Sequence, residues 1–313
     1  MQKVPLHKFR VYSLAVLAVV FWGLSYVWYK VVYQYYDPAT TMFLRLLISS
    51  TLMLLLLYTL KLGQKVERQD YRAFVILSFF SPFCYFIGES YGLLYVSPTV
   101  AAVVIATIPV FSPLLAYVAF REKIAPINVL GFLVSFFGVM IMVLDADFRF
   151  SASPLGLFLL FFAVGSALVN IIFLKKLAVK YSSFTIIGVQ NVLGALFFLP
   201  VFLVTGFRTF ISTPPTWELG GALLALAVFG STLAFMFYTS AVRAMGIART
   251  AIFTNLIPVV TAVSSYFILR EVIDLSKIIG MLVVITGLMM TQVSSLQHRR
   301  RERKAARANQ KNQ

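Results

Sequence analysis

The chain has 313 residues, of which 60% are hydrophobic and 12% are charged, whereas soluble proteins have roughly 45–50% apolar and about 25% charged residues. This composition lies far outside the soluble range and is typical of a membrane protein. The net charge of +16 does not indicate nucleic-acid binding, because the basic residues form short clusters between long uncharged segments and in the C-terminal tail.

The N-terminus resembles a signal peptide, but its apolar run continues from Val11 to Tyr29 and lacks an A-x-A cleavage site, so we expect a retained first span. Ten segments have the roughly 20 apolar residues needed to cross a bilayer. The segments, in chain order, are Val11–Tyr29, Pro38–Leu60, Ala73–Leu94, Ser97–Phe120, Ala125–Leu144, Ser151–Leu174, Tyr181–Phe207, Leu219–Val242, Thr250–Leu269 and Ile278–Gln297.

The basic residues predict the orientation, because Lys and Arg are enriched in cytoplasmic loops. Ten spans with a cytoplasmic N-terminus place twenty-one basic residues inside and four outside, the latter being Arg149, Arg208, Arg270 and Lys277. We therefore expect a multi-pass protein of the cytoplasmic membrane with both termini in the cytoplasm and with the lipid bilayer as a partner.

One stretch of sequence occurs twice. IPVFSPLLAYVAFREKI at 108–124 matches IPVVTAVSSYFILREVI at 257–273 with an offset of 149 residues, and Gly131 and Gly138 fall on Gly280 and Gly287 at the same offset. The copies lie five spans apart and must cross the membrane in opposite directions. The sequence thus predicts an all-α integral membrane protein made of two inverted five-helix repeats, at 1–146 and 147–297, followed by a basic cytoplasmic tail at 298–313.

These marks resemble the EamA branch of the drug/metabolite transporter superfamily, whose members are ten-helix carriers. The resemblance covers the whole chain and includes FWGLSYVWYK at 21–30, Pro38, Arg45, the doubled Ile-Pro and Arg-Glu pairs that contain Arg121 and Arg270, and the four glycines. It implies transport of small metabolites, often amino acids, without a nucleotide-driven engine.

Three ionisable residues lie within the spans, where charge costs at least about 2.5 kcal/mol on insertion scales. Lys30, Arg45 and Glu89 all fall near the outer ends of spans one to three. They predict a vestibule in which Arg45 holds a carboxylate while Glu89 meets an ammonium or exchanges a proton. The alternatives are an internal salt bridge and, for Lys30, extension of the side chain to the interface.

Polar and aromatic residues extend this candidate substrate site. Trp22 and Tyr26 share a helix face with Lys30 beside them, and Tyr85 shares a face with Glu89. Plain packing explains Trp22 and Tyr26 equally well. The polar candidates of the second half are Asn170, Gln190, Asn191, Ser231, Tyr238, Thr254 and Asn255. Hydrogen bonds between helices are the commoner role of such residues, and Asn255 is favoured as a site residue because it lies three residues before Pro258.

Pro109 and Pro258 interrupt spans four and nine, and each removes a backbone hydrogen bond near the middle of the bilayer. We expect each proline to act as a hinge or to produce a static kink.

No catalytic centre is predicted. His7 and His298 lie in the terminal segments, the chain has no H-E-x-x-H motif, and the single cysteine excludes an intramolecular disulfide. Asp145 and Asp147 are a loop pair, and two carboxylates rarely suffice for Ca²⁺. We therefore expect no enzyme activity, no metal and no cofactor.

The predicted function is a secondary transporter that moves small organic metabolites, including amino-acid-like solutes, by alternating access. A channel, a lipid-handling protein, and a carrier of phosphorylated, dicarboxylic or cationic drug-like solutes stay open as alternatives. So do proton coupling and a homodimer, whereas nucleic acid is not an expected partner.

Overall fold

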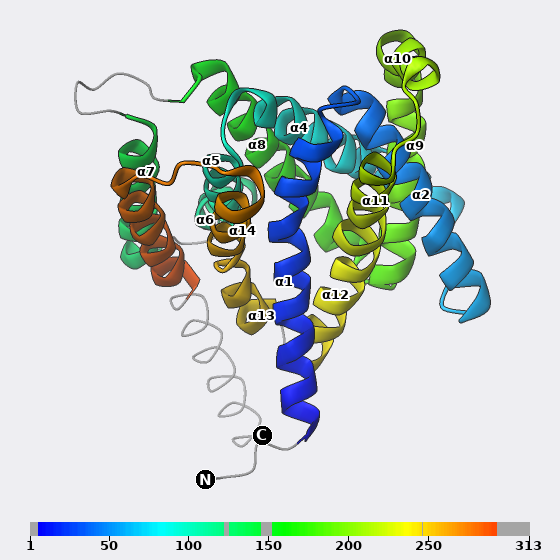
Figure 1. Cartoon of the computed structure of the whole chain (residues 1–313). Coiled ribbons are helices and arrows are strands. Elements are labelled where there is room, and N and C mark those ends of the chain that lie inside the picture. Colours follow the sequence, from blue (N-terminus) through cyan, green and yellow to red (C-terminus); the bar gives the residue numbers. More distant parts are fainter. Residues whose placement is uncertain (1–5, 122–124, 145–151, 246, 293–313) are drawn as a thin grey trace, which may run out of the picture.

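The computed structural model describes residues 6–121, 125–144, 152–245 and 247–292, and the predictions for Glu122, Asp145, Asp147 and the basic tail lie outside these ranges. The described residues form helices and connecting turns (Figure 1). Ten helical spans are long and apolar enough to cross a membrane, so the predicted all-α membrane fold is confirmed.

The first five spans are built from α1 to α7. Their elements are α1 (Leu6–Val32), α2 (Pro38–Thr59), η1 (Arg68–Asp70), α3 (Tyr71–Ser78), η2 (Phe79–Cys84), α4 (Tyr85–Tyr95), α5 (Pro98–Ala106), α6 (Ile108–Phe120) and α7 (Pro126–Val143).

The second five spans are built from α8 to α14 and a last helix. Their elements are α8 (Pro154–Leu177), α9 (Ser183–Val201), η3 (Phe202–Gly206), α10 (Phe207–Ser212), α11 (Trp217–Ala225), η4 (Leu226–Leu233), α12 (Ala234–Met245), α13 (Ile247–Thr254) and α14 (Ile257–Leu269). A last, unlabelled helix covers Leu275–Gln292.

Several helices begin at a capping residue that satisfies their first N–H groups. The Asp37 carboxylate accepts hydrogen bonds from the amides of Ala39 and Thr40 at the start of α2, where Pro38 occupies the first turn. Ser97 caps α5 in the same way with Pro98 behind it, and Ser182 caps α9. Short sequence signals therefore define where these spans begin.

Spans four and nine are each broken immediately before the repeated Ile-Pro. α5 ends at Ala106 and α6 begins at Ile108, while α13 ends at Thr254 and α14 begins at Ile257. These breaks place Pro109 and Pro258 in the first turn of the second half-helix, where the missing N–H has no intrahelical acceptor to lose. An arginine with positive φ directly follows each second half-helix, with φ of 54° at Arg121 after α6 and 56° at Arg270 after α14.

Two sides of the bundle can be distinguished. Tyr12 near the start of α1 and Gln292 at the end of the last helix both contact α13, through the Phe253 ring and the Ala251 carbonyl respectively. We call this the terminal side, at the bottom of Figure 1, and the opposite one the far side. The far side contains the end of α1 and the start of α5.

The closely packed helix pairs occur in matched sets. α1 packs against spans eight and nine, mainly through α12 and α14, and α8, which lies five spans later, packs against spans three and four, mainly through α4 and α5. α2 packs against η4 and α9 against η2, while α2 and α9 pack against each other. These two groups of five spans therefore make similar contacts between whole spans.

The four repeated glycines lie where α7 crosses the last helix. A Cβ on Gly138 would lie 2.8 Å from the Gly280 carbonyl oxygen, and a Cβ on Gly131 would lie 2.7 Å from the Gly287 carbonyl oxygen. The two backbones are in contact, so neither position can carry a larger residue without moving a helix. The crossing is antiparallel, and Gly131 and Gly138 meet each other's repeat equivalents.

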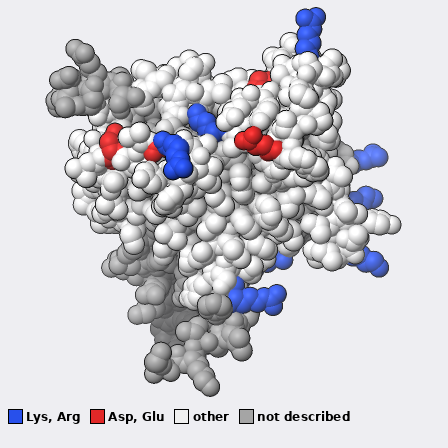
Figure 2. All heavy atoms as spheres, in the orientation of Figure 1, with Lys and Arg blue, Asp and Glu red and all other residues white. Residues whose placement is uncertain are grey.

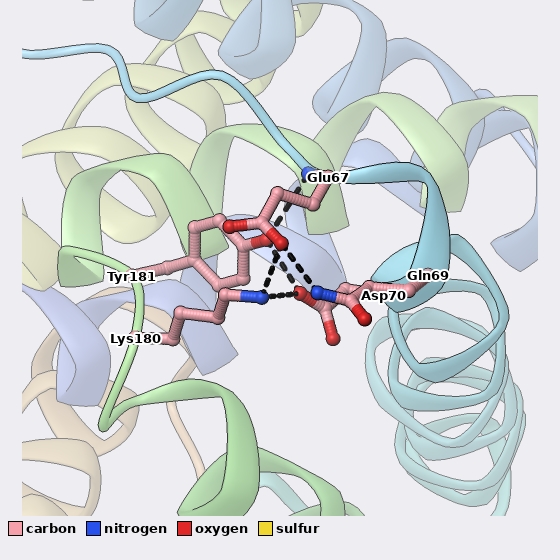
Figure 3. A network of polar contacts seen from close by, with 5 residues as sticks. All are labelled: Glu67, Gln69, Asp70, Lys180 and Tyr181. Carbon is pink, nitrogen blue, oxygen red and sulfur yellow. Dashed lines mark hydrogen bonds and ion pairs between the residues drawn. The ribbon is translucent and has the colours of Figure 1, made fainter.

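A polar cluster joins the two halves on the terminal side (Figure 3). Lys180 Nζ lies 2.7 Å from both Glu67 Oε2 and Asp70 Oδ2, and the Tyr181 hydroxyl donates to Asp70 Oδ2 at 2.6 Å. Hydrogen bonds to Lys180 and Gln69 hold the pKa of Glu67 below its usual range, and the two carboxylates raise the pKa of Lys180. This cluster ties the loop before α3 to the loop after α8.

Charge is unevenly distributed over the surface (Figure 2). On the face shown, Asp and Glu lie in the upper third, whereas Lys and Arg continue down the right edge and into the lower part. The surface between them is largely uncharged, as expected for a belt in contact with lipid.

Candidate functional site

The candidate site is built around one face of α1. Tyr29, Tyr26 and Trp22 follow one another along this face at spacings of three and four residues. Tyr29 is 1% exposed and Tyr26 is 5% exposed, so both phenols lie in the interior and need polar partners there. Three groups contact this face in turn: an arginine, a glutamate and a pair of aromatic rings.

Arg45 extends from α2 into this interior and is 3% exposed. Its guanidinium carbon lies 5.2 Å from the centre of the Tyr29 ring and 4.8 Å from the centre of the Phe86 ring, so aromatic rings flank the cation. Its Nε donates to the Ser231 hydroxyl of η4 at 2.6 Å. That bond is the single hydrogen bond of the guanidinium within the described residues, which leaves the N–H groups of both terminal nitrogens uncommitted.

The close approach of η4 to α1 depends on a glycine. A Cβ on Gly230 would lie 2.5 Å from the Ser25 hydroxyl oxygen and 3.6 Å from a terminal nitrogen of Arg45. Gly230 therefore allows η4 to approach α1 closely while Ser231, the next residue, reaches Arg45.

Glu89 lies on α4 and is 5% exposed. Its Oε1 accepts hydrogen bonds from the Tyr85 hydroxyl at 2.7 Å and from the Tyr26 hydroxyl at 3.0 Å. No donor reaches Oε2 from any side chain that the structure describes. Tyr26 and Tyr85, both predicted site residues, thus hold one carboxylate oxygen and leave the other available.

Arg45 and Glu89 are neighbours, because Arg45 stacks on Phe86 while Glu89 bonds to the adjacent Tyr85. Over the residues described, no ion pair within 4.0 Å joins the two. The predicted salt bridge is therefore not formed, and two buried opposite charges lie close together with unused hydrogen-bonding capacity on both.

Lys30 does not join this pair. Its ammonium donates to the Leu93 carbonyl at the end of α4, on the far side. Nearby, the Thr99 hydroxyl at the start of α5 donates to Glu271 at 2.9 Å, and Lys277 lies 3.4 Å from the same carboxylate. The sequence placed Lys30 at the same depth as Arg45 and Glu89, but its contacts belong to the far end of the bundle.

Trp22 lies beside aromatic rings of α12. Its ring centre is 5.1 Å from that of Tyr238 and 5.1 Å from that of Phe235. All three side chains are partly exposed. Two of them, Trp22 and Tyr238, were predicted site residues, whereas Phe235 was not, because a phenylalanine in an apolar span has no distinguishing sequence signal.

Asn255 lies apart from the site, in a reciprocal amide pair with Gln292. Asn255 Nδ2 donates to Gln292 Oε1 at 2.9 Å, and Gln292 Nε2 donates back to Asn255 Oδ1 at 3.0 Å. This pair joins the break before α14 to the last helix, and it engages both ends of the Asn255 amide.

Two polar candidates of the second half, Ser231 and Gln190, make related contacts. Ser231 anchors Arg45, as described above, and Gln190 forms the matching contact in the other half. Gln190, which falls on Arg45 at an offset of 145 residues, donates to the Ser81 carbonyl in η2 at 2.7 Å. Ser81 is extended, with φ −147° and ψ 120°, so its carbonyl is turned out of the helix. The repeat offset was the signal that could have linked these pairs.

The described residues contain no group of three or more His, Cys, Asp or Glu side chains that could hold a metal ion. The chemistry that this arrangement supports is recognition of a solute with both an anionic and a cationic group.

The sequence matches a model of the EamA-like transporter family twice, over residues 9–144 and 154–293. One solved structure, entitled "Crystal structure of protein", superposes with a TM-score of 0.65 at 15% identity, over 93% of this chain and 98% of the other. That similarity concerns the fold alone.

Three curated relatives are informative. The chain is 29% identical over 261 residues to "Uncharacterized transporter YetK" of Bacillus subtilis, which covers 81% of this chain and 78% of the relative. It is 26% identical over 272 residues to an "Uncharacterized transporter" of Archaeoglobus fulgidus, over 87% and 95% of the two chains. It is 30% identical over 196 residues to an "S-adenosylmethionine uptake transporter" of Rickettsia prowazekii, over 63% of each chain.

Proposed function

The chain belongs to the EamA-like transporter family, and we propose that this small-molecule permease is a carrier of zwitterionic, amino-acid-like solutes that works by alternating access. The observation that carries the proposal is the unused hydrogen-bonding capacity of Arg45 and Glu89. A carboxylate can bind the two terminal nitrogens of a guanidinium side by side, and an ammonium can donate to the free carboxylate oxygen.

The alternatives fit this pair less well. A phosphorylated or dicarboxylic solute needs a second cation beside Arg45, but Lys30 is bound to the Leu93 carbonyl. A purely cationic solute would bind Glu89 and leave the buried Arg45 charge without a counter-ion, which is costly in a membrane interior. A zwitterion supplies both missing charges and adds no net charge to the site.

A curated relative is consistent with this solute class. The Rickettsia prowazekii protein is named an S-adenosylmethionine uptake transporter, and S-adenosylmethionine contains an amino acid head group. This head group is the chemistry that S-adenosylmethionine shares with the proposed zwitterionic solutes.

Alternating access is supported by the matched contacts of the two halves. We propose that residues 1–146 and 147–297 are inverted repeats, because span one packs against spans eight and nine while span six packs against spans three and four. Arg270 is followed by Glu271, which contacts Thr99 at the start of span four, whereas Arg121 directly follows the end of that span. The two arginines therefore lie at opposite ends, as inverted copies require.

The two ends of the bundle are not equivalent. On the far side α5 and α14 pack closely, and the Thr99 hydroxyl at the start of α5 donates to Glu271, which follows α14. Deeper in the bundle, Tyr26 of α1 donates to Glu89 of α4. On the terminal side α6 and α13 are not among the closely packed pairs of the described helices. This asymmetry supports a state that is closed on the far side, with Pro109 and Pro258 at the breaks where the half-helices can reorient.

The proposal includes a location and an energy source. The terminal side faces the cytoplasm, because the loops on that side contain most of the Lys and Arg. Proton exchange at Glu89 would couple transport to a proton gradient. The chain acts as a carrier without catalysing a chemical reaction.

Uptake into proteoliposomes tests the proposal. The probes are labelled neutral L-amino acids, with the matching carboxylic acids and amines as unlabelled competitors, each with and without a pH gradient. The variants are Arg45→Gln and Glu89→Gln, and Arg243→Gln is the matched control because Arg243 is exposed on α12. Gln is a suitable substitute for Arg45 because Gln190 occupies the equivalent place in the second half.

We expect saturable uptake that intact amino acids inhibit and that the acids and amines inhibit poorly. Arg45→Gln should lose uptake, Glu89→Gln should lose the response to the pH gradient, and Arg243→Gln should behave as wild type. Folded Arg45→Gln and Glu89→Gln proteins that transport amino acids normally would refute the assignment of the site.

A further inference from the structure

A cluster of aromatic rings lies along α1 next to Arg45 and Glu89, and within the described residues it forms no hydrogen bond or cation–π contact with either of them. We propose that the rings of Trp22, Phe235 and Tyr238 form a second compartment of the site, which receives a flat aromatic or heteroaromatic side chain of the transported zwitterion. This inference rests on the proposed function, and it narrows the solutes to zwitterions that carry a ring.

The ring cluster lies next to Arg45 and Glu89 along one face of α1. Tyr29 contacts Arg45, Tyr26 contacts Glu89 and Trp22 contacts the α12 rings, so the three groups follow one another along a single face of α1. Trp22 lies four residues before Tyr26, which is about 6 Å along the helix axis. Helical side chains also lean toward the N-terminus, so the Trp22 ring lies farther toward the terminal side. A solute whose head group binds Arg45 and Glu89 therefore reaches these rings with its side chain.

The rings of this cluster keep faces without a stacked partner and polar groups without a hydrogen bond within the described residues. The Trp22 ring meets Phe235 at an interplanar angle of 72° and Tyr238 at 52°, so neither ring is stacked flat on it. Trp22 and Tyr238 are partly exposed, and within the described chain neither the indole N–H nor the Tyr238 hydroxyl forms a hydrogen bond. By contrast, Tyr29 and Phe86 are already occupied by Arg45. A flat ring with polar edges would use both the open ring surface and these two polar groups.

The two halves of the chain carry different residue types at the matched position of this site. At the repeat offset of 149 residues, Glu89 of α4 falls on Tyr238 of α12. The first half thus places a carboxylate where the second half places a neutral ring. The matched positions thus supply one charged group and one aromatic group, which suits a solute with a zwitterionic head and a flat side chain.

Transport selectivity tests the compartment. Uptake of labelled phenylalanine into proteoliposomes is competed with phenylalanine, tryptophan, alanine and cyclohexylalanine, the last of which has a ring of similar size that is not flat. We expect phenylalanine and tryptophan to compete about tenfold better than alanine and cyclohexylalanine. Trp22→Leu should abolish this preference, and Trp22→Phe should retain part of it.

The matched control is Trp28→Leu. Trp28 is a tryptophan of the same helix, and its ring centre lies 6.1 Å from that of Phe229, away from the proposed compartment. This variant should keep the ring preference. If Trp22→Leu fails to fold, Tyr238→Leu on α12 provides an independent removal of one compartment wall and should also reduce the preference.

A binding measurement makes the test independent of transport. The chain has three tryptophans, so replacing Trp28 and Trp217 with Phe leaves the fluorescence of Trp22 alone. Addition of phenylalanine should change this emission, and addition of alanine should not.

The outcomes separate the two proposals. Amino acid uptake without preference for rings would overturn the second compartment and leave the zwitterion carrier standing. Failure of every amino acid to be transported and to change Trp22 fluorescence would overturn both.

Discussion

The contact between α7 and the last helix leads to a quantitative prediction about stability. Gly138→Ala places a methyl group 2.7 Å from both the backbone nitrogen and the Cγ2 of Val284, and 2.8 Å from the Gly280 carbonyl oxygen. Two of these atoms belong to backbone that a rotamer change cannot move, so the helices have to separate. Overpacking of this kind costs about 1–3 kcal/mol of unfolding free energy.

The matched control is Gly165→Ala in α8, where an added Cβ meets nothing within 4 Å. Because Ala has the higher helix propensity, by up to about 1 kcal/mol, Gly165→Ala should be neutral or stabilising. Thermal unfolding in detergent measures the difference, which corresponds to about 2–4 °C in Tm per kcal/mol for chains of 150–250 residues. We expect Gly138→Ala to lower the Tm and Gly165→Ala to leave it unchanged or higher.

The repeat adds a second readout. Gly280→Ala disturbs the same crossing, since its Cβ would lie 2.6 Å from the Gly138 carbonyl oxygen. Once the helices have separated for one methyl group, the second should cost less, so the double variant should be less destabilised than the sum of the two single variants. Additive effects, or a Gly138→Ala protein as stable as Gly165→Ala, would show that the helices are not in backbone contact.

Three further predictions concern polar contacts. Ser231→Ala removes the acceptor of Arg45 Nε and should weaken solute binding about tenfold, since hydrogen bonds to charged groups contribute about 1.5–3 kcal/mol. Ser231→Thr should restore most of the lost affinity. An unchanged half-saturation constant for uptake by Ser231→Ala would contradict the anchoring role. Thr99→Val removes a far-side hydrogen bond, so far-side engineered thiols should react faster with an impermeant reagent than in wild type; equal rates would exclude this contact as part of the closure. The polar cluster of Figure 3 predicts a pH profile for Glu67→Gln. Because the folded-state pKa of Glu67 is lowered and that of Lys180 is raised, the Tm deficit of the variant should be constant between about pH 6 and pH 9. The deficit should begin to shrink as the pH falls below about 4.3, the usual pKa of glutamate, and should disappear below the lowered folded-state pKa. A deficit that stays constant through this acid range would contradict the ion pair.

Much of the fold could be predicted from sequence because each signal is local. A bilayer demands about 20 apolar residues for each helix, and the ten segments found by that criterion agree with the ten observed spans apart from shifts of several residues at their ends. The breaks in spans four and nine also follow from Pro109 and Pro258, since proline cannot donate an intrahelical hydrogen bond. The extended conformation of Ser81 likewise agrees with Pro82 behind it, because the residue before a proline is disfavoured in the helical region. The wide turn of η4 has no comparable sequence signal.

For the site, local sequence signals identify the charged residues but not their contacts. Charge within a span identified Arg45 and Glu89, because such residues are costly in hydrocarbon and mark functional positions. Sequence alone could not determine whether they form a salt bridge, because that depends on distances between α2, α4 and α1. Asn255 and Lys30 were grouped with them on chemistry, but their neighbours in space are Gln292 and Leu93.

The sequence by itself determined the membrane class, the number of spans, the repeat and the buried charged residues, since these depend on composition and on spacing along one chain. The tertiary structure decided which of these residues meet. Ser231 is 186 residues from Arg45 in the chain, and Phe235 and Tyr238 reach Trp22 only because α12 packs against α1. The physical reason is that hydrogen bonds and ring contacts act over a few ångströms, and only the packing of helices distant in sequence brings such groups within that range.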